Sequence, residues 1–285
     1  MTRRRISPIW LVLIGIASVQ LGAAVAKHLF DRVEPTALVW LRLVTSSAVL
    51  LVWARPRLRG RSRDDWLTML AFGVTLGAMN WSIYQAFARI PLGLAVTFEF
   101  TGPLLLAVVM SRRARDLVWV GLAALGVALL GFEKTDLDLA GVGFALAAGA
   151  AWAAYILLSA RTGSRWAGLD GLAMASLVAT VMLTPLAIPA GGDDLVNPEI
   201  LLLGALVGLL SSVVPYSAEL VALRRIRPGV FSILMSLEPA AAALAGIVVL
   251  QEYLTAVQWV AVAAVMVASV GATRGTDTLG EPAPD

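Results

Sequence analysis

Two apolar stretches decide the fold of this chain: AVTFEFTGPLLLAVV at residues 95–109 and FSILMSLEPAAAALAG at residues 231–246. Each stretch has a single charged residue, a glutamate (Glu99 or Glu238), with a proline close behind it. A charged side chain at the centre of a membrane-spanning helix costs about 2.5–3.5 kcal/mol on insertion scales, and such residues usually have a function. The two stretches therefore indicate a membrane protein with carboxyl groups near its centre.

The composition agrees with a membrane protein. The 285 residues are 59% hydrophobic and only 14% charged, whereas soluble domains contain about 25% charged residues. The sequence pI of about 9.7 could suggest nucleic-acid binding, but the arginines lie in short loops between apolar runs, which is the orientation signal of a membrane protein. We therefore expect a lipid bilayer and no nucleic acid as partners.

The composition also limits the chemistry. Without cysteine there are no disulfides and no thiolate sites, and with one histidine, His28, we expect no metal and no other cofactor. The sequence contains no phosphate-binding loop, zinc-protease motif or nucleophile elbow. It offers no soluble domain for an ATPase. We expect a protein that is not an enzyme, and any uphill transport would use an ion gradient or exchange.

Apolar runs of spanning length predict ten transmembrane helices. Their approximate ranges are 8–28, 36–54, 66–87, 91–111, 116–132, 140–159, 171–190, 200–222, 229–249 and 256–273. The first segment resembles a signal peptide, but its apolar run is longer than a typical signal core, so we expect it to remain as a helix. Most arginines fall on one side if the N-terminus is cytoplasmic, and ten spans then place both termini there.

The two halves align when Gly93 is matched with Gly229, because Pro103 then matches Pro239. Five spans is an odd number, so the second half must run in the opposite direction. This predicts an inverted-topology repeat, whose substrate site lies near the bilayer midplane between the repeats. The predicted units are a first repeat at 1–135, a second at 136–274 and a disordered cytoplasmic tail at 275–285.

Glu99 and Glu238 are the strongest candidate site residues. Both fall near the middle of their predicted spans, offset by three positions in the repeat alignment. Burial of a carboxyl group disfavours its charged form, which suits proton binding, and an ionised carboxylate suits an amine. The alternative is a structural role, in which hydrogen bonds hold each glutamate beside a proline kink.

Arg42 and three prolines are further candidates. Arg42 lies inside the second span, where it could bind a substrate carboxylate or Glu99, or extend to the outer headgroups. Pro103, Pro215 and Pro239 lie inside spans, where each removes one backbone donor. They could act as hinges or serve only as packing kinks.

Polar and aromatic residues inside three spans could line a cavity. They could equally form ordinary contacts between helices. These candidates for substrate or proton binding are Asn80, Trp81, Tyr84, Trp152, Tyr155 and Tyr216. Glu219, close to Arg224 and Arg225, fits a surface ion pair or a gate better than a substrate contact.

The chain resembles the EamA-type drug/metabolite transporter superfamily and, within it, the bacterial threonine/homoserine exporter group. The segments that carry the resemblance are GLAVTFEFTGPLLLAV, SRRARDLVWVGLAALG, ALAAGAAWAAYILLSAR, LSSVVPYSAELVALRRI and FSILMSLEPAAAALAG. The resemblance implies a multi-pass inner-membrane exporter of small amino acids such as threonine and homoserine, driven by exchange with protons. It carries over Glu99, Pro103, Glu238 and Pro239 as matched motif positions.

Two other functions remain open at this point. The same fold could export another small amphiphilic metabolite or drug, with Trp81, Trp152 and Tyr155 as a stacking pocket. The chain could also be a membrane scaffold that transports nothing, in which case neutral glutamine at positions 99 and 238 would change no phenotype. The sequence leaves a homo-oligomer open.

Overall fold

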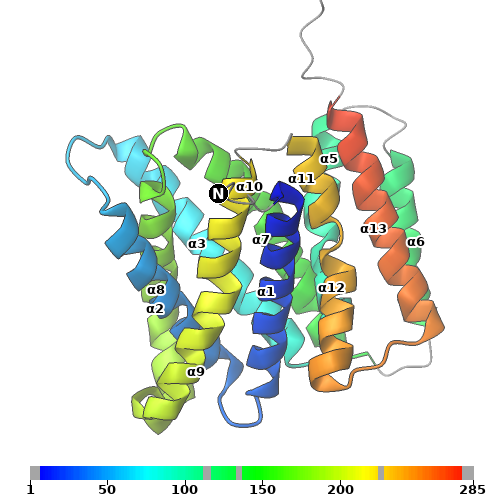
Figure 1. Cartoon of the computed structure of the whole chain (residues 1–285), viewed down its shortest axis with the longest axis horizontal. Coiled ribbons are helices and arrows are strands. Elements are labelled where there is room, and N and C mark those ends of the chain that lie inside the picture. Colours follow the sequence, from blue (N-terminus) through cyan, green and yellow to red (C-terminus); the bar gives the residue numbers. More distant parts are fainter. Residues whose placement is uncertain (1–6, 112–116, 133–136, 224–227, 278–285) are drawn as a thin grey trace, which may run out of the picture.

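The computed structural model describes residues 7–111, 117–132, 137–223 and 228–277, and all regular secondary structure in these ranges is helical. The helices stand side by side in one bundle (Figure 1). In the part of the chain that the structure describes, eight helical segments are long and apolar enough to cross a membrane, and two shorter apolar helices cover Leu117–Leu130 and Pro198–Val213. The prediction of an all-α membrane protein is confirmed.

The described part of the first half of the chain contains six helices. They are α1 (Pro8–His28), α2 (Pro35–Ala54), α3 (Arg63–Phe87), α4 (Leu92–Glu99), α5 (Thr101–Ser111) and α6 (Leu117–Phe132). The second half contains α7 (Leu139–Gly163), α8 (Asp170–Gly191), the 3₁₀ turn η2 (Gly192–Val196), α9 (Pro198–Gly208), the π-helical turn η3 (Leu209–Val213), α10 (Val214–Leu223), α11 (Pro228–Met235), α12 (Glu238–Ala245), the π-helical turn η4 (Gly246–Leu250) and α13 (Ala256–Asp277).

Several helices start where the sequence provides a cap. Proline occupies the first position of α1, α2 and α9, where its missing N–H has no helical partner in any case. Ser62 accepts a hydrogen bond from the Asp65 N–H, and the Asp65 carboxylate accepts one from the Ser62 N–H. This capping box satisfies free donors in the first turn of α3. The helix boundaries at these positions thus follow from local sequence.

The end of the chain differs from the sequence prediction. The helix α13 continues to Asp277, so residues 275–277 of the predicted tail are helical. The rest of that tail, residues 278–285, lies outside the described residues.

Small residues allow the helices to pack closely, as is common in membrane proteins. A methyl group on Gly102 would overlap the backbone of Gly149, so the start of α5 crosses α7 at backbone contact. A methyl group on Gly93 would lie 2.7 Å from the Cα atom of Ala243, so α4 and α12 also cross closely. These crossings bring the central parts of the two chain halves together.

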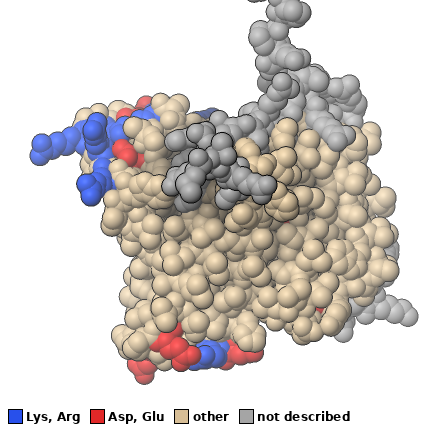
Figure 2. Space-filling view, viewed as in Figure 1, with Lys and Arg blue, Asp and Glu red and all other residues tan. Residues whose placement is uncertain are grey.

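The two membrane faces differ in charge. The helix α1 begins and α13 ends on the same face (Figure 1). In Figure 2 lysine and arginine predominate at one edge of this face, with a few acidic side chains among them, whereas the opposite face shows mainly acidic side chains around a smaller basic group. The α2–α3 connection, residues 55–62, contributes Arg55, Arg57, Arg59 and Arg61 on the first of these faces.

Candidate functional site

Two helices near the centre of the bundle are interrupted beside the candidate glutamates. Between α4 and α5 the helix is broken at Phe100, because Pro103 has no N–H to donate to the carbonyl of Glu99. That carbonyl faces α7, where a methyl group on Gly149 would overlap it. The proline thus ends α4 at Glu99, and the glycine leaves room for the freed carbonyl group.

The second interruption also lies beside a glutamate and a proline. Between α11 and α12 the chain leaves the helix at Ser236 and Leu237, just before Glu238 and Pro239. Glu238 is the first residue of α12 and is buried. A carboxylate in the first turn of a helix is favoured by the helix dipole. This local order places a second acidic group beside a helix break.

A third irregularity precedes Pro215, the remaining predicted hinge. Proline at this position cannot donate to the carbonyl of Ser211, which lies in the π-helical turn η3. Arg42 Nη2 donates to that carbonyl over 3.2 Å, and Ser18 Oγ donates to the neighbouring carbonyl of Leu210 over 2.6 Å. Side chains from α1 and α2 therefore satisfy carbonyl groups of the irregular helix.

These interruptions surround one cavity of about 630 Å³, a volume typical of small-molecule sites. Most predicted site residues line it: Arg42, Asn80, Glu99, Pro103, Trp152, Tyr155, Pro215 and Glu238. Pro239 is buried and is not part of the lining. The side chain of Tyr216 lies outside the described residues.

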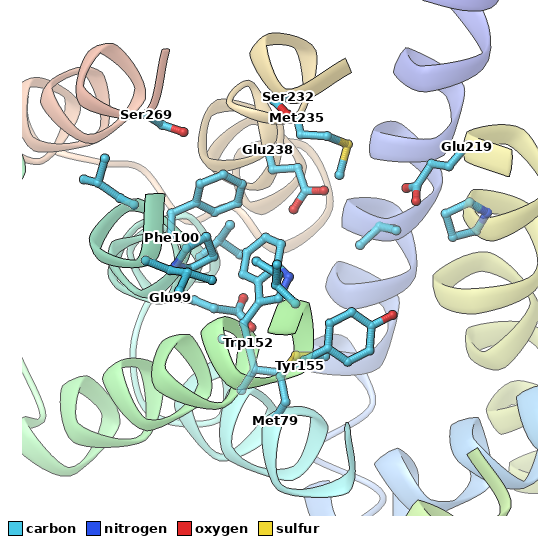
Figure 3. Close-up of a pocket in the computed structure, with 18 of the residues that line it drawn as sticks. Met79, Glu99, Phe100, Trp152, Tyr155, Glu219, Ser232, Met235, Glu238 and Ser269 are labelled. Atoms are coloured by element: carbon cyan, nitrogen blue, oxygen red, sulfur yellow. The ribbon is translucent and has the colours of Figure 1, made fainter. Parts of the chain in front are cut away.

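Three carboxyl groups face the cavity from three helices. Figure 3 shows Glu99 of α4, Glu219 of α10 and Glu238 of α12 pointing toward a shared space. Among the described residues none of them forms an ion pair or a hydrogen bond with another side chain. When ionised, they repel one another across the cavity. The arrangement favours an occupant that brings positive charge, either a proton or an ammonium group.

Arg42 supplies the positive charge of the cavity lining among the described residues. Its guanidinium carbon lies 5.6 Å from the centre of the Tyr84 ring, a cation–π distance. Its Nε atom is buried and has no hydrogen-bond partner. Guanidinium donors have the geometry that binds a carboxylate with two hydrogen bonds. Arg42 therefore has donor capacity left for an anionic group.

Several other polar atoms in or beside the cavity lining are buried and lack partners. They are Gln20 Oε1, Tyr84 Oη and Ser211 Oγ. Gln20 and Ser211 line the cavity, and the Tyr84 hydroxyl lies close to Arg42 and Ser211 without a hydrogen bond of good geometry. Buried polar atoms without partners are unfavourable, and they cluster at functional sites. This end of the cavity is thus suited to a polar ligand.

Aromatic side chains form the wall near Glu99. Trp152 lies edge-on to Phe100, with ring centres 4.9 Å apart, and so supports the residue at the helix break. Tyr155 packs on Phe72 at 5.0 Å. Trp152 and Tyr155 lie beside Glu99 and Met79 in Figure 3. They give the cavity an apolar surface beside the Glu99 carboxyl group.

The structure places neither Trp81 nor Tyr84 in the cavity wall. The Trp81 Nε1 atom donates to Thr36 Oγ1 over 3.2 Å, and its ring lies edge-on to Phe144, between α2 and α7. Tyr84 is fully buried behind Arg42, in contact with Phe30. Asn80 does line the cavity, while its side-chain amide donates to Leu76 O over 2.8 Å.

The cavity lining also includes Gln20 and Glu219, which were not predicted to bind a ligand. Gln20 is a polar residue within the first apolar run. Because polar groups in a membrane span need hydrogen-bond partners, its position in the sequence could have marked it as a candidate binding residue. Glu219 lies near enough to arginines in the sequence to look like an interface residue. In the structure its carboxyl group points into the cavity (Figure 3). Within the described residues no group of three or more His, Cys, Asp or Glu could hold a metal ion.

The fold and the site define a multi-pass membrane protein with a polar internal cavity. The model of the EamA-like transporter family matches residues 139–274. The threonine/homoserine exporters RhtA of Salmonella typhimurium (strain LT2) and Escherichia coli (strain K12) are each 40% identical over 273 residues, which cover 93% of this chain and 92% of the relative. The chain belongs to the EamA-like transporter family and is a multi-pass protein of the inner membrane.

A solved structure supports the fold. One crystal structure of a protein superposes with a TM-score of 0.63 and covers 95% of this chain and 99% of that chain, at 18% identity. At this level of identity the match concerns the fold alone.

Proposed function

We propose that this protein exports small amino acids such as threonine and homoserine from the cytoplasm. The observation that carries the proposal is the 40% identity, over 93% of the chain, to relatives named as threonine/homoserine exporters. The cavity supports it, because Arg42 suits the carboxylate of an amino acid and the glutamates suit its ammonium group.

We further propose ten spans in two inverted repeats. The two shorter apolar helices, Leu117–Leu130 and Pro198–Val213, would complete the ten. In support, α4 and α11 begin at Leu92 and Pro228, one residue before the matched Gly93 and Gly229, and both end after eight residues at a helix break. Interrupted helices at corresponding positions of two halves are the typical mark of a transporter binding site.

The orientation follows from the charge of the two faces. With the arginine-rich face in the cytoplasm, the start of α1 and the end of α13 lie there. The cavity lining reaches Met110, Phe231 and Thr273, which lie near the cytoplasmic ends of their helices. On the other side the lining stops before the connections that follow α1 and α3. This arrangement corresponds to a state open toward the cytoplasm.

In the proposed cycle a cytoplasmic amino acid enters between the halves, and Arg42 takes its carboxylate. Glu99 and Glu238 take its ammonium group in place of protons. The halves then rock about the breaks near Pro103, Pro215 and Pro239. This motion closes the cytoplasmic side of the cavity and opens the outer side. Protons from outside displace the amino acid and return the empty carrier. The breaks suit hinges because their backbone hydrogen bonds are already missing.

The alternative within transport is another small amphiphilic metabolite or drug. Trp152 and Tyr155 at the cavity wall would favour an aromatic or cationic compound. A resistance screen against such compounds separates this alternative from amino-acid export. A scaffold without transport predicts instead that neutral side chains at the glutamate positions leave every phenotype unchanged.

The test is uptake of labelled threonine into inverted membrane vesicles with an acidic lumen. We expect uptake that follows the proton gradient and is competed by homoserine. Glu99→Gln and Glu238→Gln should reduce uptake to background. Glu199→Gln should have no effect, because Glu199 is an exposed carboxylate beside Arg32. Absence of uptake by verified, inserted protein would reject threonine as substrate. Normal uptake by both cavity variants would reject the proposed roles of the glutamates.

A further inference from the structure

On the face opposite the cytoplasmic one, a partly buried ion pair joins the two halves of the chain. Lys27 Nζ lies 2.5 Å from Glu252 Oε1, with side chains 16% and 20% exposed. Lys27 Nζ also donates to Ile90 O over 2.7 Å. The pair thus connects the end of α1, the α3–α4 connection and the segment between η4 and α13.

Glu252 makes a second contact that reaches toward the cavity. Its Oε2 atom accepts a hydrogen bond from the Leu92 N–H over 2.8 Å. Leu92 is the first residue of α4, and the preceding Pro91 has no side-chain oxygen to cap the helix. Glu252 therefore caps α4 from the other half of the chain, since first-turn N–H groups have no partner inside their own helix.

The helix that Glu252 caps ends at Glu99. Every residue of α4 from Leu92 to Phe98 is buried, and eight helical residues measure about 12 Å. A short buried helix moves as a rigid unit, so a shift at its capped end is passed on to Glu99. Close contact between Gly93 of α4 and Ala243 of α12 fixes the same unit.

The ion pair lies across the closed side of the cavity. The cavity lining on this side ends at Ala23, Phe87 and Val96, and the residues of the pair lie beyond that limit, next to the connections. Lys27 and Glu252 together bridge α1 to the start of α4, through the Ile90 carbonyl and the Leu92 N–H. An outward path between α1 and α4 has to break this bridge, and we place the break at the Lys27–Glu252 pair. Both charged groups would then be hydrated again. Because an ion pair at intermediate exposure is only modestly stabilising, the pair can separate and form again.

We propose that Lys27 and Glu252 form the outer gate of the transport path, and that Glu252 also acts as a positioning residue that holds Glu99 through α4. The outer gate is closed in this structure and opens when the carrier faces outward. This inference rests on the proposed transport function. The gate, however, can be tested without any substrate.

The first test measures access to the cavity from outside. The chain contains no cysteine, so a single Ala23→Cys variant provides one thiol at the outer limit of the cavity. We expect Lys27→Gln or Glu252→Gln to raise its labelling by an impermeant thiol reagent at least about fivefold, the lower end of ordinary coupling between sites. Glu199→Gln, which breaks the exposed Arg32–Glu199 pair on the same face, is the matched control. Equal labelling in all variants overturns the gate.

The second test locks the gate. A Lys27→Cys/Glu252→Cys variant, joined by a short bifunctional methanethiosulfonate reagent that forms a disulfide with each cysteine, should lose threonine uptake and regain it when a reductant cleaves these disulfides. The same treatment of Arg32→Cys/Glu199→Cys should leave uptake intact. Full uptake by the cross-linked gate pair overturns the proposal. Altered Ala23→Cys labelling without any threonine transport would instead uphold the gate and reject the substrate.

The positioning role has its own readout. Glu252→Gln keeps an oxygen that can accept from Leu92 N–H but removes the charge, whereas Glu252→Leu removes both. If Glu252 positions Glu99, the KM for threonine rises in Glu252→Leu beyond its value in Glu252→Gln. Equal KM values in these two variants would mean that the contact with α4 has no influence on the site.

Discussion

At the scale of single residues, Arg42 is the most constrained group of the site. It donates to the carbonyl that Pro215 leaves free, lies against the Tyr84 ring and still has an unpaired Nε. A guanidinium can serve a backbone carbonyl and a substrate carboxylate together, whereas an ammonium is a single point charge. The site thus depends on the shape of this cation as well as on its charge.

Replacement of Arg42 by lysine should therefore weaken threonine binding while it preserves charge. We expect the KM for threonine to rise about tenfold, as for the loss of one charge-assisted hydrogen bond of about 1.5 kcal/mol. Uptake kinetics in inverted vesicles measure it, with Arg32→Lys as the control on an exposed cation. An unchanged KM would show that Arg42 has only a structural role and does not bind the substrate carboxylate.

Tyr84 gives a second prediction at this scale. Its hydroxyl is buried without a good hydrogen bond, and its ring supports Arg42. Tyr84→Phe keeps the ring, so the free energy of unfolding should change by less than about 1 kcal/mol. Tyr84→Ala leaves a cavity and should cost about 3–5 kcal/mol. Thermal unfolding in detergent distinguishes the two, and equal losses would assign a hydrogen bond to the hydroxyl.

The sequence identified site residues where a single charge or polar group interrupts an apolar run. That signal located Glu99, Glu238, Arg42 and Asn80 in the cavity lining. It could not separate Trp81 from Asn80, because a buried membrane helix is apolar on most sides and its periodicity does not mark which side faces a cavity.

At the scale of helices, the tightest packing lies where the break after α4 crosses α7. A methyl group on Gly149 would overlap the carbonyl oxygen of Glu99, which is backbone and cannot rotate away. Gly143 lies on the same helix, and nothing lies within 4 Å of a methyl group placed on it. Substitution of these two glycines therefore compares a crowded position, Gly149, with an open position, Gly143, on the same helix.

The two alanine variants should change stability in opposite directions. Gly149→Ala forces α7 away from the break and should cost about 1–3 kcal/mol. Gly143→Ala removes a flexible residue from a helix interior and should be neutral or stabilise by up to about 1 kcal/mol. Thermal unfolding of the purified variants tests this, and similar shifts for both would mean that the crossing adapts.

Helix positions were largely predictable because apolar runs bounded by charged connections mark them. The interruptions within the helices were harder to predict. The prolines indicated where backbone donors are missing, yet no residue pattern predicted that η3 and η4 are π-helical turns or that α13 continues to Asp277. Such features depend on neighbouring helices, as the bonds from Ser18 and Arg42 to η3 show.

At the scale of the whole molecule, the direction of transport depends on which face lies in the cytoplasm. Described lysine and arginine side chains gather on the face where α1 begins (Figures 1 and 2), and basic connections are retained on the cytoplasmic side. The cavity extends toward that same face, and the ion pair between Lys27 and Glu252 closes the other. One orientation therefore determines the direction of the whole proposed cycle.

The orientation can be measured with single cysteines, since the native chain has none. Leu58 lies in the α2–α3 connection and is 47% exposed, and Val196 ends η2 on the opposite face and is 75% exposed. Replacement of either by cysteine leaves every charge in place, so the signal for insertion is unchanged. We expect an impermeant maleimide to label Val196→Cys in intact cells, and Leu58→Cys only after permeabilisation. The reverse pattern would place the cavity opening outside, and the protein would then be open to the exterior in this state.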